Sequence, residues 1–398
     1  MNPYTKVALK DDPALMPFNI INENNIFSDI RGYPAAMEKY RELANKAHPE
    51  MENLSAEKQD NAYGRFIIEM QQKIYRDMKD HLLQLGVTQA TSDMNVSAIV
   101  AQVPSRNKQD YIDNHYYHAL YPFYAKGPVV QDQSAPSAQW FRFPLYLAPT
   151  RIFGKPFAAN ETQICYANGY RMQYAALIAA FSGLQGWDQV LHYSWSHSTR
   201  PFEAPVATDR LNYCQDPLMV IADRIPALMK LRKSPVYIPY VVTTEHINSV
   251  VRMTTGGPAF PAEYCRLGMF ARIGSILADR DLPELKDALF LVVPAKMDIP
   301  DYLKQYPIVR DNADLPAELK KYPIPAGTGF DGKQVVSSTG ELVYEIDRSL
   351  RMVTPEAEAL LLQDGCSELA GTVMALHVGL CYDGIDGGEL RFDSGGED

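Results

Sequence analysis

Strand-like and helix-like segments alternate along the first 232 residues, and this alternation constrains the fold most strongly. Short runs of β-branched and aromatic residues precede longer stretches in which apolar side chains recur at helical spacing. The predicted strands cover 15–21, 87–91, 111–117, 155–161 and 190–195, and the predicted helices cover 34–47, 56–85, 170–184 and 217–232. Such alternation is typical of parallel βαβ units, so the sequence predicts an α/β fold.

The pattern changes near residue 234. A strand is predicted at 236–244, a helix at 261–278 and a strand at 288–293, and Ser-Thr-Gly between alternating runs predicts a hairpin within 335–354. We therefore expect three regions: the βαβ region at 1–233, a connecting α/β segment at 234–287, and a smaller, sandwich-like β-rich accessory domain at 288–398.

Two of the predicted strands are followed or ended by the same pair of residues, Asn-Glu. Glu23 comes after the first strand and Glu161 ends the fourth. Parallel α/β barrels present their catalytic groups at the carboxyl ends of the strands. Two glutamates there suit glycosidic bond cleavage, in which one protonates the leaving oxygen and the other, about 5–5.5 Å away in retaining enzymes, attacks the anomeric carbon.

The spacing of these residues fits barrel units of roughly 30 residues. Glu161 and Trp195 are 34 positions apart, which is one unit, and Glu23 lies 138 positions before Glu161, which allows three units with insertions. Within the strand at 111–117, the period of two places His115 and Tyr117 on one face together with Asp113. A surface position for Glu161 remained the competing interpretation.

This order of motifs resembles the clan of retaining (β/α)8 glycoside hydrolases that includes family 5 cellulases and family 42 β-galactosidases. In that clan an Asn-Glu pair ends the fourth strand, the nucleophilic Glu ends the seventh, and a Trp usually ends the eighth. The phrases Asp-Asn-His-Tyr-Tyr at 113–117, Asn-Gly-Tyr-Arg at 168–171 and Leu-Gln-Gly-Trp-Asp-Gln-Val at 184–190 are similar to a bacterial branch of it. The resemblance covers about residues 11–232.

The resemblance implies a role for each matching residue. Glu23 would be the acid/base and Glu161 the nucleophile of a double displacement on β-linked oligo- or polysaccharides. The expected substrate-binding residues are Asn22, which would contact the sugar 2-hydroxyl, His115 and Tyr117 from the sixth strand, and Trp195 as the sugar platform.

The same match implies a TIM barrel of which only strands four to eight are present. Three preceding units would need roughly 90 residues, and only about a dozen precede the first strand. We therefore expect 1–233 to be the C-terminal portion of a catalytic barrel that lacks an N-terminal segment. A polysaccharide substrate would place the full-length enzyme in the periplasm or outside the cell.

The composition argues against other classes of function. A net charge of −10 and a pI near 5.4 oppose binding to a nucleic-acid backbone, and no apolar run is long enough to span a membrane. The five cysteines are widely spaced, and the histidines complete no recognisable ligand spacing. We expect neither metal nor cofactor. A metal-dependent barrel hydrolase and a non-catalytic carbohydrate-binding fragment are the alternatives.

Overall fold

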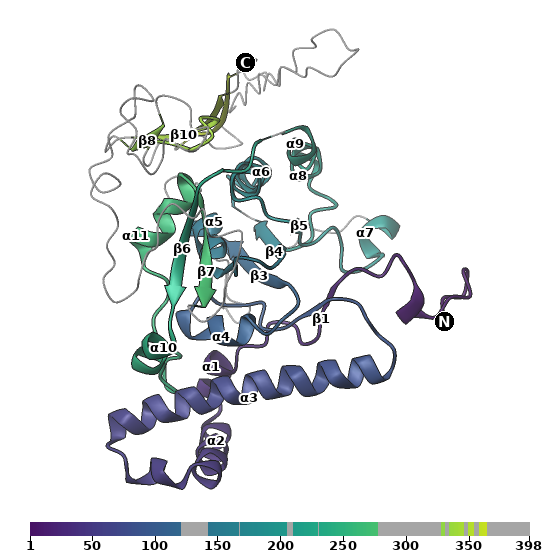
Figure 1. Cartoon of the computed structure of the whole chain (residues 1–398). Coiled ribbons are helices and arrows are strands. Elements are labelled where there is room, and N and C mark those ends of the chain that lie inside the picture. Colours follow the sequence, from purple (N-terminus) through teal and green to yellow (C-terminus); the bar gives the residue numbers. More distant parts are fainter. Residues whose placement is uncertain are drawn as a thin grey trace.

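Parallel strands form the centre of the first half of the chain (Figure 1). The computed structural model describes residues 1–120, 142–166, 168–204, 210–229, 231–277, 328–330, 334–345, 349–353 and 358–363. β1 (Phe18–Asn19) pairs with β2 (Thr91–Ser92), and β3 (Ile112–His118), β4 (Phe157–Ile164) and β5 (Gln189–His192) form a second sheet in that order. Every pairing within these two sheets is parallel, as the strand–helix alternation predicts.

The helices of this region begin and end near the predicted residues. α2 (Pro34–Ala47) has proline at its first position, and α3 (Ala56–Gln84) is followed by Gly86 in a left-handed conformation, with φ +80°. α6 (Gln173–Gln185) is buried almost all round, which explains why its sequence is apolar on every face. α3 crosses one end of the molecule in Figure 1, and α1 (Ile26–Asp29) lies beside it. The predicted helices at 34–47, 56–85 and 170–184 are confirmed by α2, α3 and α6.

Shorter helices connect the remaining elements. They are α4 (Val103–Arg106), α5 (Arg142–Leu147), α7 (Arg200–Glu203), α8 (Pro217–Ala222), α9 (Ile225–Leu228), α10 (Thr244–Val250) and α11 (Ala262–Arg266). The Asp216 carboxylate caps α8 by accepting from the backbone N–H groups of Leu218 and Met219. The single helix predicted over 217–232 is wrong, because α8 ends before α9 begins and Pro226 cannot occupy the interior of a continuous helix.

The predicted helix at 261–278 is also wrong beyond α11. Residues 272–277 form β7 (Arg272–Leu277), which pairs in parallel with β6 (Tyr237–Val242), a strand that the sequence does predict. Gly268 and Gly274 weaken a helix here, and the β-branched Ile273 and Ile276 favour a strand.

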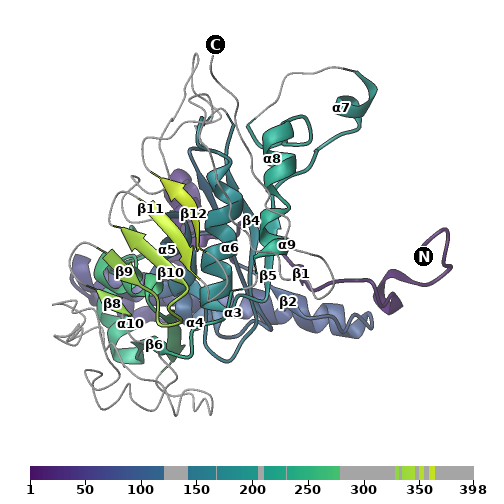
Figure 2. The same ribbon diagram turned by 90° about the horizontal axis from the view of Figure 1, so that it is seen from above.

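Five antiparallel strands make a separate sheet near the C-terminus. It contains β8 (Gly329–Phe330), β9 (Gln334–Val336), β10 (Leu342–Glu345), β11 (Ser349–Val353) and β12 (Glu358–Gln363), in the spatial order β12-β11-β10-β9-β8. The predicted hairpin is confirmed by the β9–β10 pairing around Gly340. The predicted strand at 288–293 lies outside the described residues. Figure 2 shows this sheet lying beside α6.

The C-terminal sheet joins the same core as the parallel strands. Arg232 donates from Nε to Glu341 Oε1 at 2.6 Å and from its backbone N–H to Glu341 Oε2 at 2.8 Å. Ser234 Oγ and Ser338 Oγ are 2.6 Å apart, and the buried cluster runs from Phe27 to Met352. The buried core therefore continues across residue 233. The division into three regions stays a prediction.

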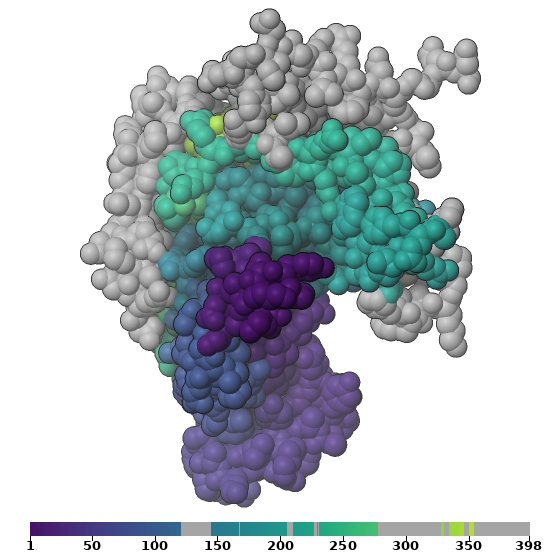
Figure 3. All heavy atoms as spheres, turned by 90° about the vertical axis from the view of Figure 1, so that its right-hand side faces the viewer, coloured from purple at the N-terminus to yellow at the C-terminus, as the bar shows by residue number. Residues whose placement is uncertain are grey.

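The described residues form a mixed α/β fold but no closed barrel. Within the described ranges, the outer edges of β1 and β5 have no pairing strand. Figure 3 shows the right-hand side of the view in Figure 1, with the N-terminal residues in dark purple and the α7–α8 region in teal. The TIM-barrel assignment is therefore a prediction. Across the described ranges, no helix combines the length and the apolar character that crossing a membrane requires.

Candidate functional site

A buried carboxylate joins the first four parallel strands beneath the candidate site. Asp113 on β3 accepts hydrogen bonds from Ser92 Oγ on β2 at 2.8 Å and from Asn160 Nδ2 on β4 at 2.6 Å. Asn19 Nδ2 on β1 is 3.3 Å from both Asp113 oxygens. β1 and β2 form one sheet and β3, β4 and β5 another, so the Asp113 carboxylate links the two sheets.

Above this layer the two predicted glutamates meet at His115. A carboxylate oxygen of Glu23, a carboxylate oxygen of Glu161 and a ring nitrogen of His115 all lie within 4.8 Å of one another. His115 Nδ1 is 3.1 Å from Glu23 Oε1 and 3.4 Å from Glu161 Oε2. The His115 side chain is buried, whereas that of Glu23 is 48% exposed, so solvent reaches the cluster from the Glu23 side.

A β-bulge directs Glu161 into this cluster. Asn114 pairs with Ala159 and His115 pairs with Glu161, which leaves Asn160 as the extra residue of β4. Strict alternation would send consecutive side chains to opposite faces. The bulge instead lets Asn160 bond to Asp113 while Glu161 approaches His115. Glu161 consequently lies within β4, not at its end as the sequence predicts.

Tyr117 holds the Glu161 carboxylate from the other side. Its hydroxyl donates to Glu161 Oε2 at 2.7 Å, and alternation along β3 places it on the same face as Asp113 and His115, as the sequence predicts. Burial, followed by this hydrogen bond, raises the pKa of Tyr117 far above its usual value. Tyr117 therefore keeps its proton near neutral pH and donates a hydrogen bond to Glu161.

Glu23 is held in a turn four residues beyond the end of β1. Its φ is +53°, and its backbone N–H donates to Asn95 Oδ1 at 2.6 Å. The hydrogen bond from His115 lowers the pKa of Glu23, against the opposing effect of burial. Asn22 Oδ1 accepts from Asn95 Nδ2 at 3.2 Å, so both residues of the predicted pair are tied to the loop after β2.

Positive φ angles concentrate around this cluster. Of the five non-glycine residues with positive φ in the described part of the chain, Glu23 belongs to the cluster, and Met94 and Ser97 lie in the loop that carries Asn95. Arg106, which is 1% exposed, donates to the carbonyls of Met94 at 2.8 Å and Ser97 at 2.9 Å. Strained backbone persists only where its surroundings fix it, and it is found most often at functional sites.

Trp195, the predicted sugar platform, packs against Tyr213, and its role in the site stays a prediction. β5 ends at His192, and the Trp195 ring is 48% exposed and packs edge-on against Tyr213, with ring centroids 5.5 Å apart. Tyr193, which the sequence analysis does not single out, lies beside the site: its ring is 6.3 Å from that of Tyr117. Burial and the charges of Glu161 and Glu23 raise the pKa of Tyr193. Asn95 and Asn160 were missed as well.

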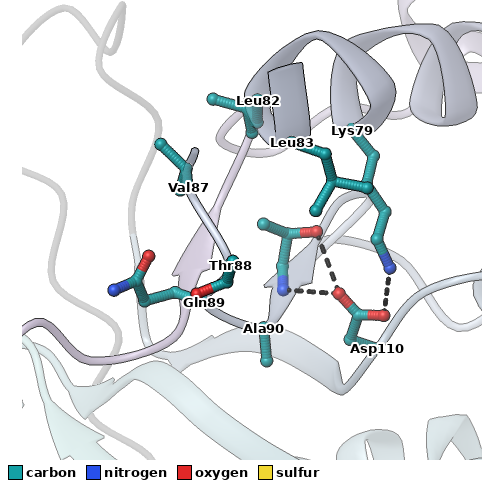
Figure 4. A pocket seen from close by; sticks show the side chains of 9 residues that line it. Lys79, Leu82, Leu83, Val87, Thr88, Gln89, Ala90 and Asp110 are labelled. Atoms are coloured by element: carbon teal, nitrogen blue, oxygen red, sulfur yellow. Dashed lines mark hydrogen bonds and ion pairs between the residues drawn. The ribbon is translucent and has the colours of Figure 1, made fainter. Parts of the chain in front are cut away.

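A pocket of about 410 Å³ lies at the opposite end of the strands (Figure 4). It is lined by the end of α3, by the residues leading into β2 and by Asp110 just before β3. Asp110 pairs with Lys79 and accepts from the backbone N–H of Thr91 at 3.0 Å. Because Asp110 precedes β3 and His115 lies in its middle, this pocket is separate from the glutamate cluster.

Comparison with known proteins supplies no relative from which a role could be transferred. No protein-family model matches the sequence, and searches of curated proteins and of solved structures found no significant match.

Proposed function

We propose that the chain is a retaining glycoside hydrolase of the (β/α)8 type, with Glu161 as nucleophile and Glu23 as acid/base. The observation that carries the proposal is the separation of the two carboxylates, whose nearest oxygens lie within 4.8 Å. Double displacement needs carboxyl groups about 5–5.5 Å apart, whereas inverting enzymes need roughly 6.5–9.5 Å to admit a water molecule. The pair comes from β4 and from the turn after β1, two elements that belong to parallel sheets.

The contacts of Glu161 suit its role as the nucleophile. Tyr117 and His115 both approach Oε2 of Glu161, so Oε1 is the oxygen available to attack the anomeric carbon. The glycosidic C–O bond then breaks while Glu23 gives its proton to the leaving oxygen. In the second half, Glu23 takes a proton from water, the water oxygen bonds to the anomeric carbon, and the ester to Glu161 breaks. Two inversions restore the original configuration.

The stereochemistry of the product tests this proposal directly. The chain would be incubated with aryl β-glucosides, β-galactosides and β-mannosides, and the first-formed sugar would be observed by NMR before it mutarotates. A β-anomer is the expected product. An α-anomer would exclude double displacement. Sugar binding without turnover, unaffected by changing either glutamate, would instead favour a carbohydrate-binding protein.

The pH profile should report the bond between His115 and Glu23. Glu23 must be protonated to act as the acid, so kcat/KM falls as the pH rises through the Glu23 pKa, which His115 lowers. Replacing His115 by Leu removes the donor, so we expect the alkaline limb of kcat/KM to move to higher pH while the maximal rate falls. Tyr117→Phe is the matched control, because Tyr117 bonds to Glu161 and not to Glu23. An alkaline limb that stays in place in His115→Leu would show that another group is the acid.

A further inference from the structure

The two nitrogens of the His115 ring face partners of opposite character. Nδ1 faces the carboxylates of Glu23 and Glu161, which accept protons. Nε2 lies 2.8 Å from Asn95 Nδ2, an amide nitrogen that donates. A neutral imidazole carries one proton, and which nitrogen holds it decides what the ring can do.

The orientation of the Asn95 amide is fixed by a backbone N–H on one side and a carboxylate on the other. Its Oδ1 accepts the backbone N–H of Glu23 at 2.6 Å, and a flipped amide would set two donors against each other there. Its Nδ2 lies 3.2 Å from Asn22 Oδ1 and 3.4 Å from Asp113 Oδ2, and both of these oxygens are acceptors. An amide nitrogen carries two hydrogens: the short contact with His115 Nε2 takes one, and Asn22 and Asp113 share the other. Nε2 therefore accepts, and the ring proton is on Nδ1.

The same three side chains have the geometry of a metal site. Glu23, His115 and Glu161 offer two oxygens and one nitrogen within 4.8 Å, which suits a divalent transition metal. A metal on Nδ1 requires a lone pair at that atom and a proton on Nε2, and metal-bound histidines give this second proton to an acceptor. Here Nε2 would meet the Asn95 donor, so metal binding would place two N–H groups against each other.

We propose that Asn95 is a positioning residue that holds His115 as the Nδ1–H tautomer. In this tautomer the His115 ring donates a hydrogen bond toward the two glutamates, and Nδ1 has no lone pair with which to bind a divalent metal. The importance of this tautomer for catalysis rests on the proposed function, but the tautomer itself does not. Arg106 holds the loop carbonyls on either side of Asn95, at Met94 and Ser97, so the amide is kept in place.

The tautomer can be read by NMR without any assay of turnover. The full chain, with ¹⁵N-labelled histidines, would be studied near neutral pH, and His115→Gln would identify the His115 signal among the eight histidines. In the wild type we expect the proton on Nδ1. In Asn95→Asp a carboxylate oxygen faces the ring, so Nε2 should become protonated. Asn22→Asp is the control: it adds the same charge beside Asn95 without facing the ring, and should keep the wild-type signal.

Binding of Zn²⁺ alone provides the second measurement. By calorimetry, Asn95→Asp should bind Zn²⁺ about 10- to 100-fold more tightly than the wild type, the usual effect of the group behind a metal-bound histidine. Adding Glu161→Gln to Asn95→Asp should remove the gain. A wild-type proton on Nε2, an unchanged tautomer in Asn95→Asp, or equal Zn²⁺ affinity in the two proteins would overturn the proposal. Absence of glycosidase activity would overturn only the proposed function.

Discussion

Replacing Glu161 by Gln should abolish turnover of an activated aryl β-glycoside. The amide keeps the shape of the side chain and can still accept from Tyr117, but it cannot form the covalent bond to the anomeric carbon. Loss of the nucleophile in a serine hydrolase lowers kcat by on the order of 10⁶-fold, and we expect a fall of several orders of magnitude here. The initial rate of aryl alcohol release measures this effect.

Azide distinguishes loss of a nucleophile from general damage. In Glu161→Ala the space left by the side chain admits azide, which attacks the anomeric carbon directly. One displacement inverts the centre, so the product should be the α-glycosyl azide from a β-glycoside. The exposed Glu69 on α3 supplies the control, since Glu69→Gln should leave the rate unchanged. Full activity of Glu161→Gln would remove Glu161 as the nucleophile. So would the absence of a glycosyl azide product from Glu161→Ala, provided that this variant still binds the substrate.

The sequence predicts correctly those elements whose position depends on neighbouring residues, such as helix ends set by proline or glycine. The proline at Pro34 and the glycine at Gly86 mark helix ends by fixing or freeing φ, and α2 begins at Pro34 while α3 ends before Gly86. Alternation along β3 likewise predicted that His115 and Tyr117 share a face. The segment at 272–277 was misassigned because a short apolar run suits either a helix or a strand, and its pairing with β6 decides the outcome.

The sequence predicted the two glutamates but not what arranges them. Glu161 faces the site because of a bulge, which depends on the register between β3 and β4 and has no period in the sequence. Asn95 is important because its amide lies between Glu23, 72 positions earlier, and His115, 20 positions later. An asparagine in a loop gives no local signal of such contacts. Periodicity therefore finds the strands, while the hydrogen-bond partners that set protonation states come only from three-dimensional structure.

Replacing Glu23 by Ala should slow the two chemical steps unequally. A leaving group that is already acidic departs without a general acid, so the glycosylation step on an activated aryl glycoside should change little. The second step loses its base, so the glycosyl-enzyme should accumulate and give a burst of aryl alcohol followed by a slow steady state. For an alkyl or sugar leaving group the first step should fall by about 10²- to 10⁴-fold, the usual contribution of general acid–base catalysis.

The anomer of the azide product from Glu23→Ala then distinguishes the roles of the two glutamates. Here azide attacks the glycosyl-enzyme on Glu161 after one inversion has taken place, so the product should be the β-glycosyl azide and the steady-state rate should rise. The opposite anomers from Glu23→Ala and Glu161→Ala would assign both roles in one experiment. The half-exposed Glu23 side chain leaves the face toward solvent open for azide to enter. The same anomer from both variants, or an equal loss of rate with activated and poor leaving groups, would show that Glu23 does not transfer the proton.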